Sequence, residues 1–181
     1  MDCVEVEPRR ALAADPVRTS SPRYNLPISK LHGVPYRARL ALKVHRITTC
    51  IQLLATAGDV GTRAALAQAA QIDPDVLDRL VRRADMARVN GIGVVFGLML
   101  EELGVREIAV LAGCDPQRLH ERLRRYNQRE RVARRAPTVE EVAAWVAQAR
   151  LLPILLTRAD GENAAAQPTL GWRRPSTSPM P

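Results

Sequence analysis

The amino-acid sequence predicts an all-α protein, with tandem helix-hairpin-helix units, a connecting helical pair between them and a C-terminal capping helix. Hydrophobic residues make up 46% of the chain but aromatic residues only 3%, so the core must be largely aliphatic. This composition favours helices, because Ala and Leu are strong helix formers. No stretch alternates polar and apolar residues over several strands. A hairpin followed by a helical pattern also occurs twice, which indicates repeated units.

The clearer hairpin is residues 89–93, with the sequence VNGIG. Gly91 and Gly93 can adopt positive φ without a steric penalty. Gly93 opens a helix whose first backbone N–H groups lack helical partners, and such amides bind phosphate. The helix is expected to end at Gly104 in the left-handed conformation. An ordinary glycine turn is the alternative interpretation of this hairpin.

A second copy of the pattern lies 58 residues earlier, where residues 28–35 (ISKLHGVP) align with residues 86–93 and Gly33 aligns with Gly91. The other matching positions are hydrophobic: Leu40 and Leu98, Leu42 and Leu100, Ile47 and Val105, and Leu53 and Leu111. The sequence therefore predicts hairpin units at about 26–55 and 85–112.

The two hairpins differ in the groups that they offer to phosphate. In the first, Pro35 stands where the second has Gly93, which removes a backbone donor, but Arg37 supplies a nearby cation. In the second, Val94 and Val95 follow the hairpin and no cation is adjacent. We expect each hairpin alone to bind phosphate weakly.

Capping residues predict the remaining helices. Asp73-Pro74 and Asp115-Pro116 each pair an N-cap with a proline in the first turn. Thr138 with Glu141 forms a capping box before the last helix. Thr48 or Thr49 is expected to cap a short helix through Leu54, and Thr62 is expected to cap a helix from Arg63 to Ala70.

Charge is consistent with binding to a polyanion. The net charge is +8 and the isoelectric point about 10.4. Arg118, Arg122, Arg125 and Arg129 follow helical spacing and should share one face of a helix. That face could contact phosphates, or it could simply be solvated.

Several stretches are similar to one known family: ISKLHGVP, RITTCIQLL, RAALAQAAQIDPDVLDRLVRRADMARVNGIG, ELGV and RAPTVEEVAAWVAQA. From Tyr24 to Pro153 the chain resembles the bacterial family catalogued as domain of unknown function 4332. The resemblance implies a tandem helix-hairpin-helix architecture and assigns no activity. It therefore bears on the fold more than on the function.

The first functional hypothesis is non-enzymatic, largely sequence-independent binding of nucleic acid, mainly the backbone of double-stranded DNA. The candidate contacts are Gly33, Val34, Arg37, Arg88, Asn90, Gly91, Ile92, Gly93, Arg118, Arg122, Arg125 and Arg129. An alternative is a protein-interaction or scaffold module that uses the apolar hairpin tips Ile92, Val94 and Val95. A third interpretation is a helix-turn-helix with residues 75–83 as its recognition helix.

Other functional classes lack a sequence signal. No Walker loop, paired carboxylates or Ser/His/Asp grouping indicates an enzyme, and no cofactor is implied. The cysteines and histidines have no metal-ligand spacing; they are Cys3, Cys50, Cys114, His32, His45 and His120.

The organisation of the chain completes the prediction. No leader and no long apolar run occurs, so we expect a cytoplasmic protein without membrane contact. Residues 24–153 should form the ordered domain. Residues 1–23 should form a flexible lead and residues 154–181 a disordered tail, because Pro, Ser and charged residues dominate both ends.

Overall fold

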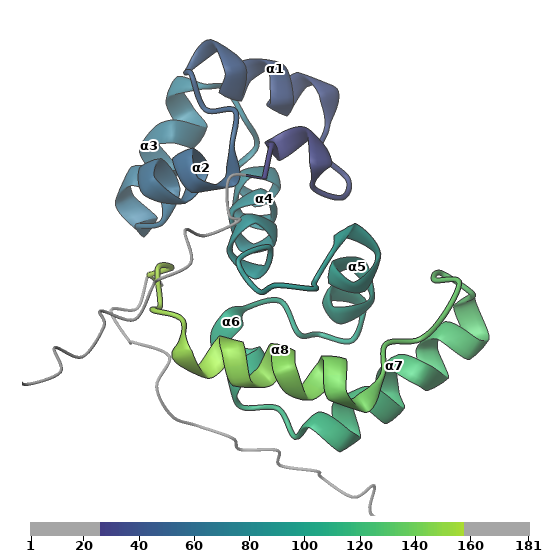
Figure 1. Ribbon diagram of the computed structural model, residues 1–181. Coiled ribbons are helices and arrows are strands. Elements are labelled where there is room, and N and C mark those ends of the chain that lie inside the picture. Colours follow the sequence, from purple (N-terminus) through teal and green to yellow (C-terminus); the bar gives the residue numbers. More distant parts are fainter. Residues whose placement is uncertain (1–25, 158–181) are drawn as a thin grey trace, which may run out of the picture.

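The computed structural model describes residues 26–157, which form helices joined by short connections (Figure 1). The helices are η1 (Ile28–Lys30, a 3-10 turn), α1 (Tyr36–Val44), α2 (Cys50–Ala57), α3 (Val60–Ala69), α4 (Pro74–Met86), α5 (Val94–Glu102), α6 (Ile108–Ala112), α7 (Pro116–Glu130) and α8 (Val139–Leu151). Within these residues there is no β-strand, only an isolated bridge between Pro27 and Thr49. The all-α prediction is confirmed.

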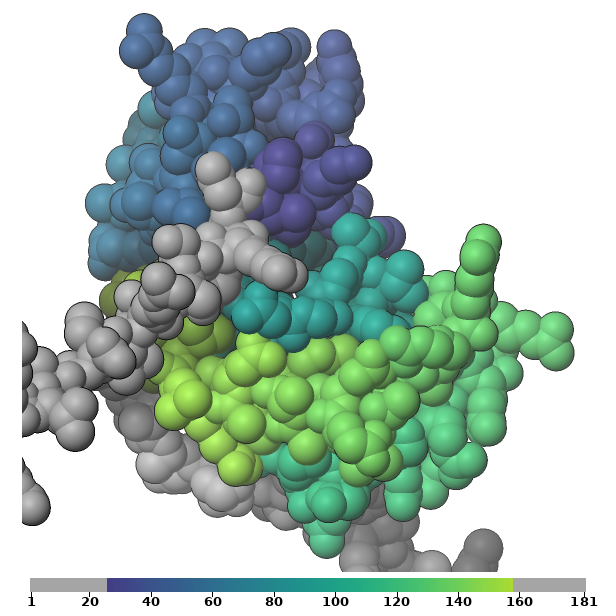
Figure 2. All heavy atoms as spheres, viewed as in Figure 1, coloured from purple at the N-terminus to yellow at the C-terminus, as the bar shows by residue number. Residues whose placement is uncertain are grey.

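The helices divide into two units, each with its own hydrophobic core. Unit 1 (residues 26–84) contains α1 to α3 and most of α4, and unit 2 (residues 85–152) contains α5 to α8. The end of α4 passes from one core to the other, since Ala84 belongs to the first and Met86 to the second. In Figure 1 α4 lies between the units, and in Figure 2 the units meet at the teal residues in the middle of the molecule.

The repeat that the sequence predicts is visible in the backbone. Tyr36 and Val94 begin α1 and α5, and Cys50 and Ile108 begin α2 and α6, so both pairs lie 58 residues apart. Gly33 and Gly91 have φ of +58° and +91°.

The same register continues at the ends of α1 and α5. Arg46 has φ of +60° and Gly104 has φ of +83°, and after each the next amide bonds back over the last helical turn. In unit 2 this bond runs from the Val105 N–H to the Leu100 carbonyl at 2.8 Å. The left-handed conformation predicted at Gly104 is confirmed.

Local capping explains where the other helices start. Asp73, Asp115 and Thr138 cap α4, α7 and α8 as predicted, and Thr49 caps α2. The predicted N-cap of α3 is wrong, because Asp59 and not Thr62 caps that helix, which begins at Val60. Asp59 Oδ2 accepts from the Gly61 and Thr62 N–H groups at 2.8 and 3.2 Å, which adds nearly one turn at the start of α3.

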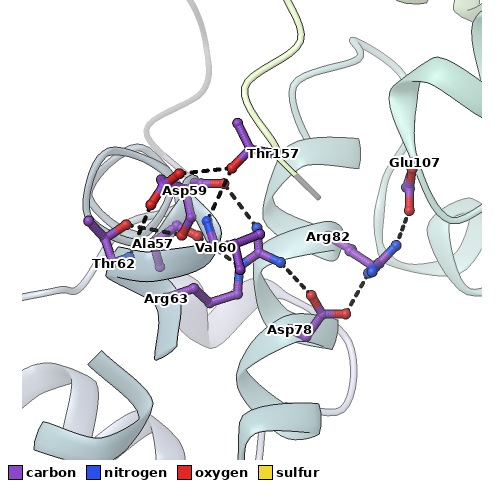
Figure 3. Close-up of polar contacts among 10 residues, drawn as sticks. Ala57, Asp59, Val60, Thr62, Arg63, Asp78, Arg82, Glu107 and Thr157 are labelled. Carbon is purple, nitrogen blue, oxygen red and sulfur yellow. Dashed lines mark hydrogen bonds and ion pairs between the residues drawn. The ribbon is translucent and has the colours of Figure 1, made fainter. Parts of the chain in front are cut away.

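Ion pairs hold the two units together (Figure 3). Arg82 of α4 bonds Asp78 at 2.6 Å and also pairs with Glu107, which precedes α6 in unit 2. The second oxygen of Asp78 accepts from Arg63 of α3 at 2.5 Å. This chain of charges connects α3, α4 and the start of α6.

The chain beyond α8 folds back onto unit 1 (Figure 3). The Thr157 hydroxyl donates to Asp59 at 3.0 Å and accepts from the Val60 N–H at 3.1 Å, while Leu156 packs against the core of unit 1. The sequence predicts a disordered tail from residue 154, whereas residues 155–157 contact the α2–α3 turn and the core of unit 1. The predicted lead (residues 1–23) and the rest of the tail lie outside the described residues.

Candidate nucleic-acid interface

The second hairpin uses its own amides inside the protein. The Ile92 N–H donates to the Val89 carbonyl at 3.2 Å, and the Gly93 N–H donates to the Gly91 carbonyl at 3.1 Å. The Asn90 N–H donates to Gln148 Oε1 of α8 at 3.0 Å. Three of the amides expected to contact phosphate therefore already have protein acceptors, and the open amides begin with Val94 at the start of α5.

Gly91 has a packing role. Its positive φ suits glycine, and a Cβ at this position would lie 2.7 Å from Nε1 of Trp145. Trp145 is only 2% exposed and its ring lies 5.3 Å from that of Phe96, centroid to centroid. α8 thus packs against the hairpin at Gly91, one of the predicted phosphate contacts.

Arg88 differs most from its predicted role as an exposed cation. It is 4% exposed, bonds the Asp85 carboxylate at 2.6 Å and donates to the Pro153 carbonyl at 2.9 Å. Burial raises the pKa of Asp85, and Arg88 opposes that rise through its hydrogen bond and charge. This buried pair ties the end of α4 to the chain after α8.

The first hairpin is more open. Gly33 is exposed, and Val34 is half-buried against the core of unit 1. Arg83 of α4 supports the hairpin by donating to the His32 carbonyl at 2.6 Å, and it also bonds both oxygens of Glu101 at 2.7 and 2.8 Å. α1 follows with no side-chain cap, so its first amides face outward without helical partners.

A set of cations without acidic neighbours in sequence extends from η1, before this hairpin, to the end of α1. Residues 26–58 contain no Asp or Glu, and their basic side chains are all exposed; they are Lys30, Arg37, Arg39, Lys43 and Arg46. None of them forms an ion pair with another of the described residues. We call these five residues the α1 cation set. Of these five residues, the functional hypothesis names only Arg37. The absence of acidic residues from this stretch can nevertheless be read from the sequence.

The arginines of α7 form a separate basic surface in unit 2, at a distance from α1 (Figure 1). Arg118, Arg122, Arg125 and Arg129 are all exposed. Arg125 and Arg129 pair with Glu121 at 3.4 Å and with Glu130 at 2.6 Å. Arg122 donates to the Leu103 carbonyl at 2.7 Å. This surface is therefore partly neutralised, unlike the α1 cation set.

The structure also bears on the two other interpretations. Ile92 is 7% exposed and belongs to the core of unit 2, so the hairpin tip offers only Val94 and Val95 to a protein partner. Within residues 75–83, only Asp75 and Arg79 are exposed, because the rest of that segment packs or pairs within the molecule. A recognition helix would need a more exposed face.

The described residues include two free cysteines, Cys50 and Cys114, both at least partly buried. Burial raises the pKa of the Cys50 thiol to about 11, which disfavours its reactive thiolate form, and burial also raises the pKa of half-buried Cys114. No group of three His, Cys, Asp or Glu side chains between residues 26 and 157 is placed to hold a metal ion. No helix in this part of the chain is long and apolar enough to cross a bilayer.

Comparison with known proteins identifies the family. The sequence profile of domain of unknown function 4332 matches residues 33–152, which is most of the chain. The protein belongs to this family. The match covers both repeated hairpin regions except the first turn of unit 1, and it carries no assigned activity. No curated protein and no solved structure matches the chain.

Proposed function

We propose that this member of domain of unknown function 4332 is a tandem helix-hairpin-helix protein that binds the nucleic-acid backbone without catalysis and largely without sequence preference. The observation that carries the proposal is the α1 cation set, because it includes Arg37 and Arg39 in the first turn of an uncapped helix and residues 26–58 contain no acidic residue. Free amides and unpaired cations together are the groups that bind phosphate.

The first hairpin is the principal contact in this proposal. Lys30 and Arg37 lie on either side of Gly33, and the amides of Tyr36 and Arg37 open α1. The second hairpin contributes less, since its Ile92 and Gly93 amides have internal acceptors. The α7 arginines would provide a secondary contact with a longer duplex.

Fluorescence anisotropy with random duplex DNA across a salt series tests this function. We expect the wild type to lose affinity steeply with salt, because each neutralised phosphate adds about 0.9 to the slope of log affinity against log salt. Removing two contacts with Arg37→Ala and Lys43→Ala should lower the slope by about 2. Arg150→Ala on α8 is the control for charge at a remote site and should change little.

Two results would contradict the proposal: no binding at low salt, or equal losses in the α1 and α8 variants after correction for the number of charges removed. Arg118→Ala with Arg122→Ala measures the secondary contact in the same assay. If these α7 changes cause the larger loss, the principal contact lies on α7 instead.

A protein-interaction function is the second candidate, and one observation favours it. Tyr36, Leu40 and Val44 share one face of α1 and are 69%, 51% and 74% exposed, although they are large and apolar. A complex captured by the wild type, resistant to nuclease and lost with Leu40→Ser and Val44→Ser would support this candidate. Loss of every captured partner after nuclease treatment would exclude it.

A further inference from the structure

An open cavity of about 1020 Å³ lies between the two units. Its walls come from the segment before α1, the exposed side of α4, the second hairpin and α5. Small-molecule sites in proteins usually have volumes of about 300–1,000 Å³ and few polar groups around an apolar floor. The cavity therefore has the size of a ligand site, and of the cations in the two basic surfaces described above only Lys30 lines it.

The floor and the rim of this cavity differ in chemistry. The floor is apolar; it includes Leu31, Met86, Val89, Leu98 and Val105. Five basic and two acidic side chains line the cavity, an excess of three positive charges. Arg82 and Arg83 are bound to Asp78 and Glu101, so the unpaired charge comes from the remaining cations.

Those remaining cations converge from three separate segments. Lys30 comes from η1, Arg79 from α4 and Arg106 from the α5–α6 connection, and all three are exposed. None of the three forms an ion pair within the described part of the chain. These three charges are therefore available to an anionic ligand in the cavity.

We propose that the cavity binds one nucleotide unit, with its base on the apolar floor and its phosphates on Lys30, Arg79 and Arg106. The unit could be a free nucleotide or an unpaired nucleotide of a single strand, since both present the same chemistry. The guanidinium groups of Arg82 and Arg83 are held by carboxylates, and such fixed planar groups stack on bases.

Asn90 provides a group for recognising the base. Its backbone is bound to Gln148 through the Asn90 N–H and carbonyl at 3.0 and 3.4 Å. Asn90 lines the cavity, and its side-chain amide has no hydrogen-bond partner among residues 26–157. An amide in this position can donate to and accept from the edge of a base. This binding goes beyond the proposed function, which depends on the outer surface of α1.

Isothermal titration of the full chain with ATP, adenosine and tripolyphosphate tests the proposal. A site for both base and phosphate should bind ATP at least tenfold more tightly than either fragment. Arg79→Ala with Arg106→Ala, at two cavity cations that lie outside the α1 cation set, should weaken ATP binding at least tenfold. Leu98→Trp fills the cavity from a half-buried position without changing charge, and it should cause a similar loss.

Arg37→Ala with Lys43→Ala is the matched control, because it also removes two positive charges, but from residues that do not line the cavity. It should leave the affinity for ATP within twofold of the wild type and lower the affinity for duplex DNA. Loss of ATP binding only in the cavity variants, and of duplex binding only in the α1 variant, separates this proposal from the proposed function. Tripolyphosphate binding as tight as that of ATP, or equal loss of ATP in both double variants, overturns the nucleotide site.

A short 5′-phosphorylated single strand distinguishes the two sources of the nucleotide. If ATP displaces this strand and Arg79→Ala with Arg106→Ala weakens the binding of both, the cavity accepts a nucleotide within a strand. If only ATP binds there, the ligand is a free nucleotide. If neither ligand responds to the cavity variants, the proposal is wrong, whatever the result with duplex DNA.

Discussion

At the scale of single residues, Gly91 is a predicted phosphate contact that also has a packing role in the structure. The sequence predicts that this glycine lets phosphate approach the backbone, and in the structure it lets Trp145 approach instead. Its φ of +91° adds a second reason for glycine at this position. Gly93, two residues later, has an extended backbone, and a Cβ added there would meet nothing within 4 Å.

These two glycines give a matched pair of variants. Gly91→Ala should lower the free energy of unfolding by about 2–4 kcal/mol, because it combines backbone strain with displacement of a core tryptophan. Gly93→Ala should change it by less than about 1 kcal/mol. Urea denaturation measures both. Similar losses in the two variants would show that the contact with Trp145 does not constrain the hairpin.

At the scale of elements, α8 illustrates how a helix start gathers several interactions on one carboxylate. Glu141 accepts from the Thr138 N–H at 2.8 Å, which completes the capping box. It also receives two bonds from Arg135, both at 2.7 Å. The bond from Arg135 and the backbone bond at Thr138 lower the pKa of Glu141 to about 2.

This lowered pKa predicts a pH-dependent contribution to stability. A carboxyl group with a depressed pKa in the folded state stabilises the fold above its unfolded pKa of about 4.3, and that stabilisation is lost as the pH falls towards 2. Glu141→Gln keeps the cap acceptor but removes the charge. It should cost about 1 kcal/mol at pH 7, since solvent screens this exposed pair.

Thermal unfolding between pH 7 and pH 2 measures the effect. The difference between wild type and Glu141→Gln should shrink as the pH falls through this window. Thr138→Ala is the comparison, because it removes the cap and should cost about 1 kcal/mol at neutral pH. A difference for Glu141→Gln that stays constant down to pH 2 would contradict the assigned role of its charge.

At the scale of the whole molecule, the two units have separate hydrophobic cores and are joined by a few side-chain contacts. Arg83 is the central link, because it joins the first hairpin at the His32 carbonyl to Glu101 of α5 in unit 2. The pair of Arg82 with Glu107 and the bond between Thr157 and Asp59 reinforce it. The arginines of α4 in these links also line the cavity between the units.

Loss of Arg83 should therefore uncouple the units. Arg83→Met keeps most of the side-chain volume but removes its bonds to Glu101 and to the His32 carbonyl, and it should cost about 1–3 kcal/mol. In a Trp172→Phe background, Trp145 is the remaining tryptophan and reports unit 2. The midpoints by its fluorescence and by far-UV circular dichroism should then diverge. Arg79→Met on the same helix is the control, and its two midpoints should coincide.

Local chemistry made much of the fold predictable. The starts of α4, α7 and α8 follow from Asp73, Asp115 and Thr138, because a cap is made between residues only two or three positions apart. The left-handed Gly104 likewise depends on bonds within one helical turn. The 58-residue repeat is found by aligning the chain with itself. The absence of acids near α1 is also readable in the chain, although its value as a site needed the exposure of those cations.

The fate of the candidate site residues depended instead on segments distant in sequence. The Asn90 backbone is bound by Gln148 of α8 and the Arg88 side chain by Pro153 after it, so neither group is free for the predicted contact. Gly91 is exposed but packs against Trp145, so a side chain there would meet the indole ring. The sequence determined the helices and their repetition because those arise from neighbouring residues. Only the tertiary structure decided which amides and cations remain open, because Gln148 of α8 and Pro153 after it bind the Asn90 backbone and the Arg88 side chain from far along the chain.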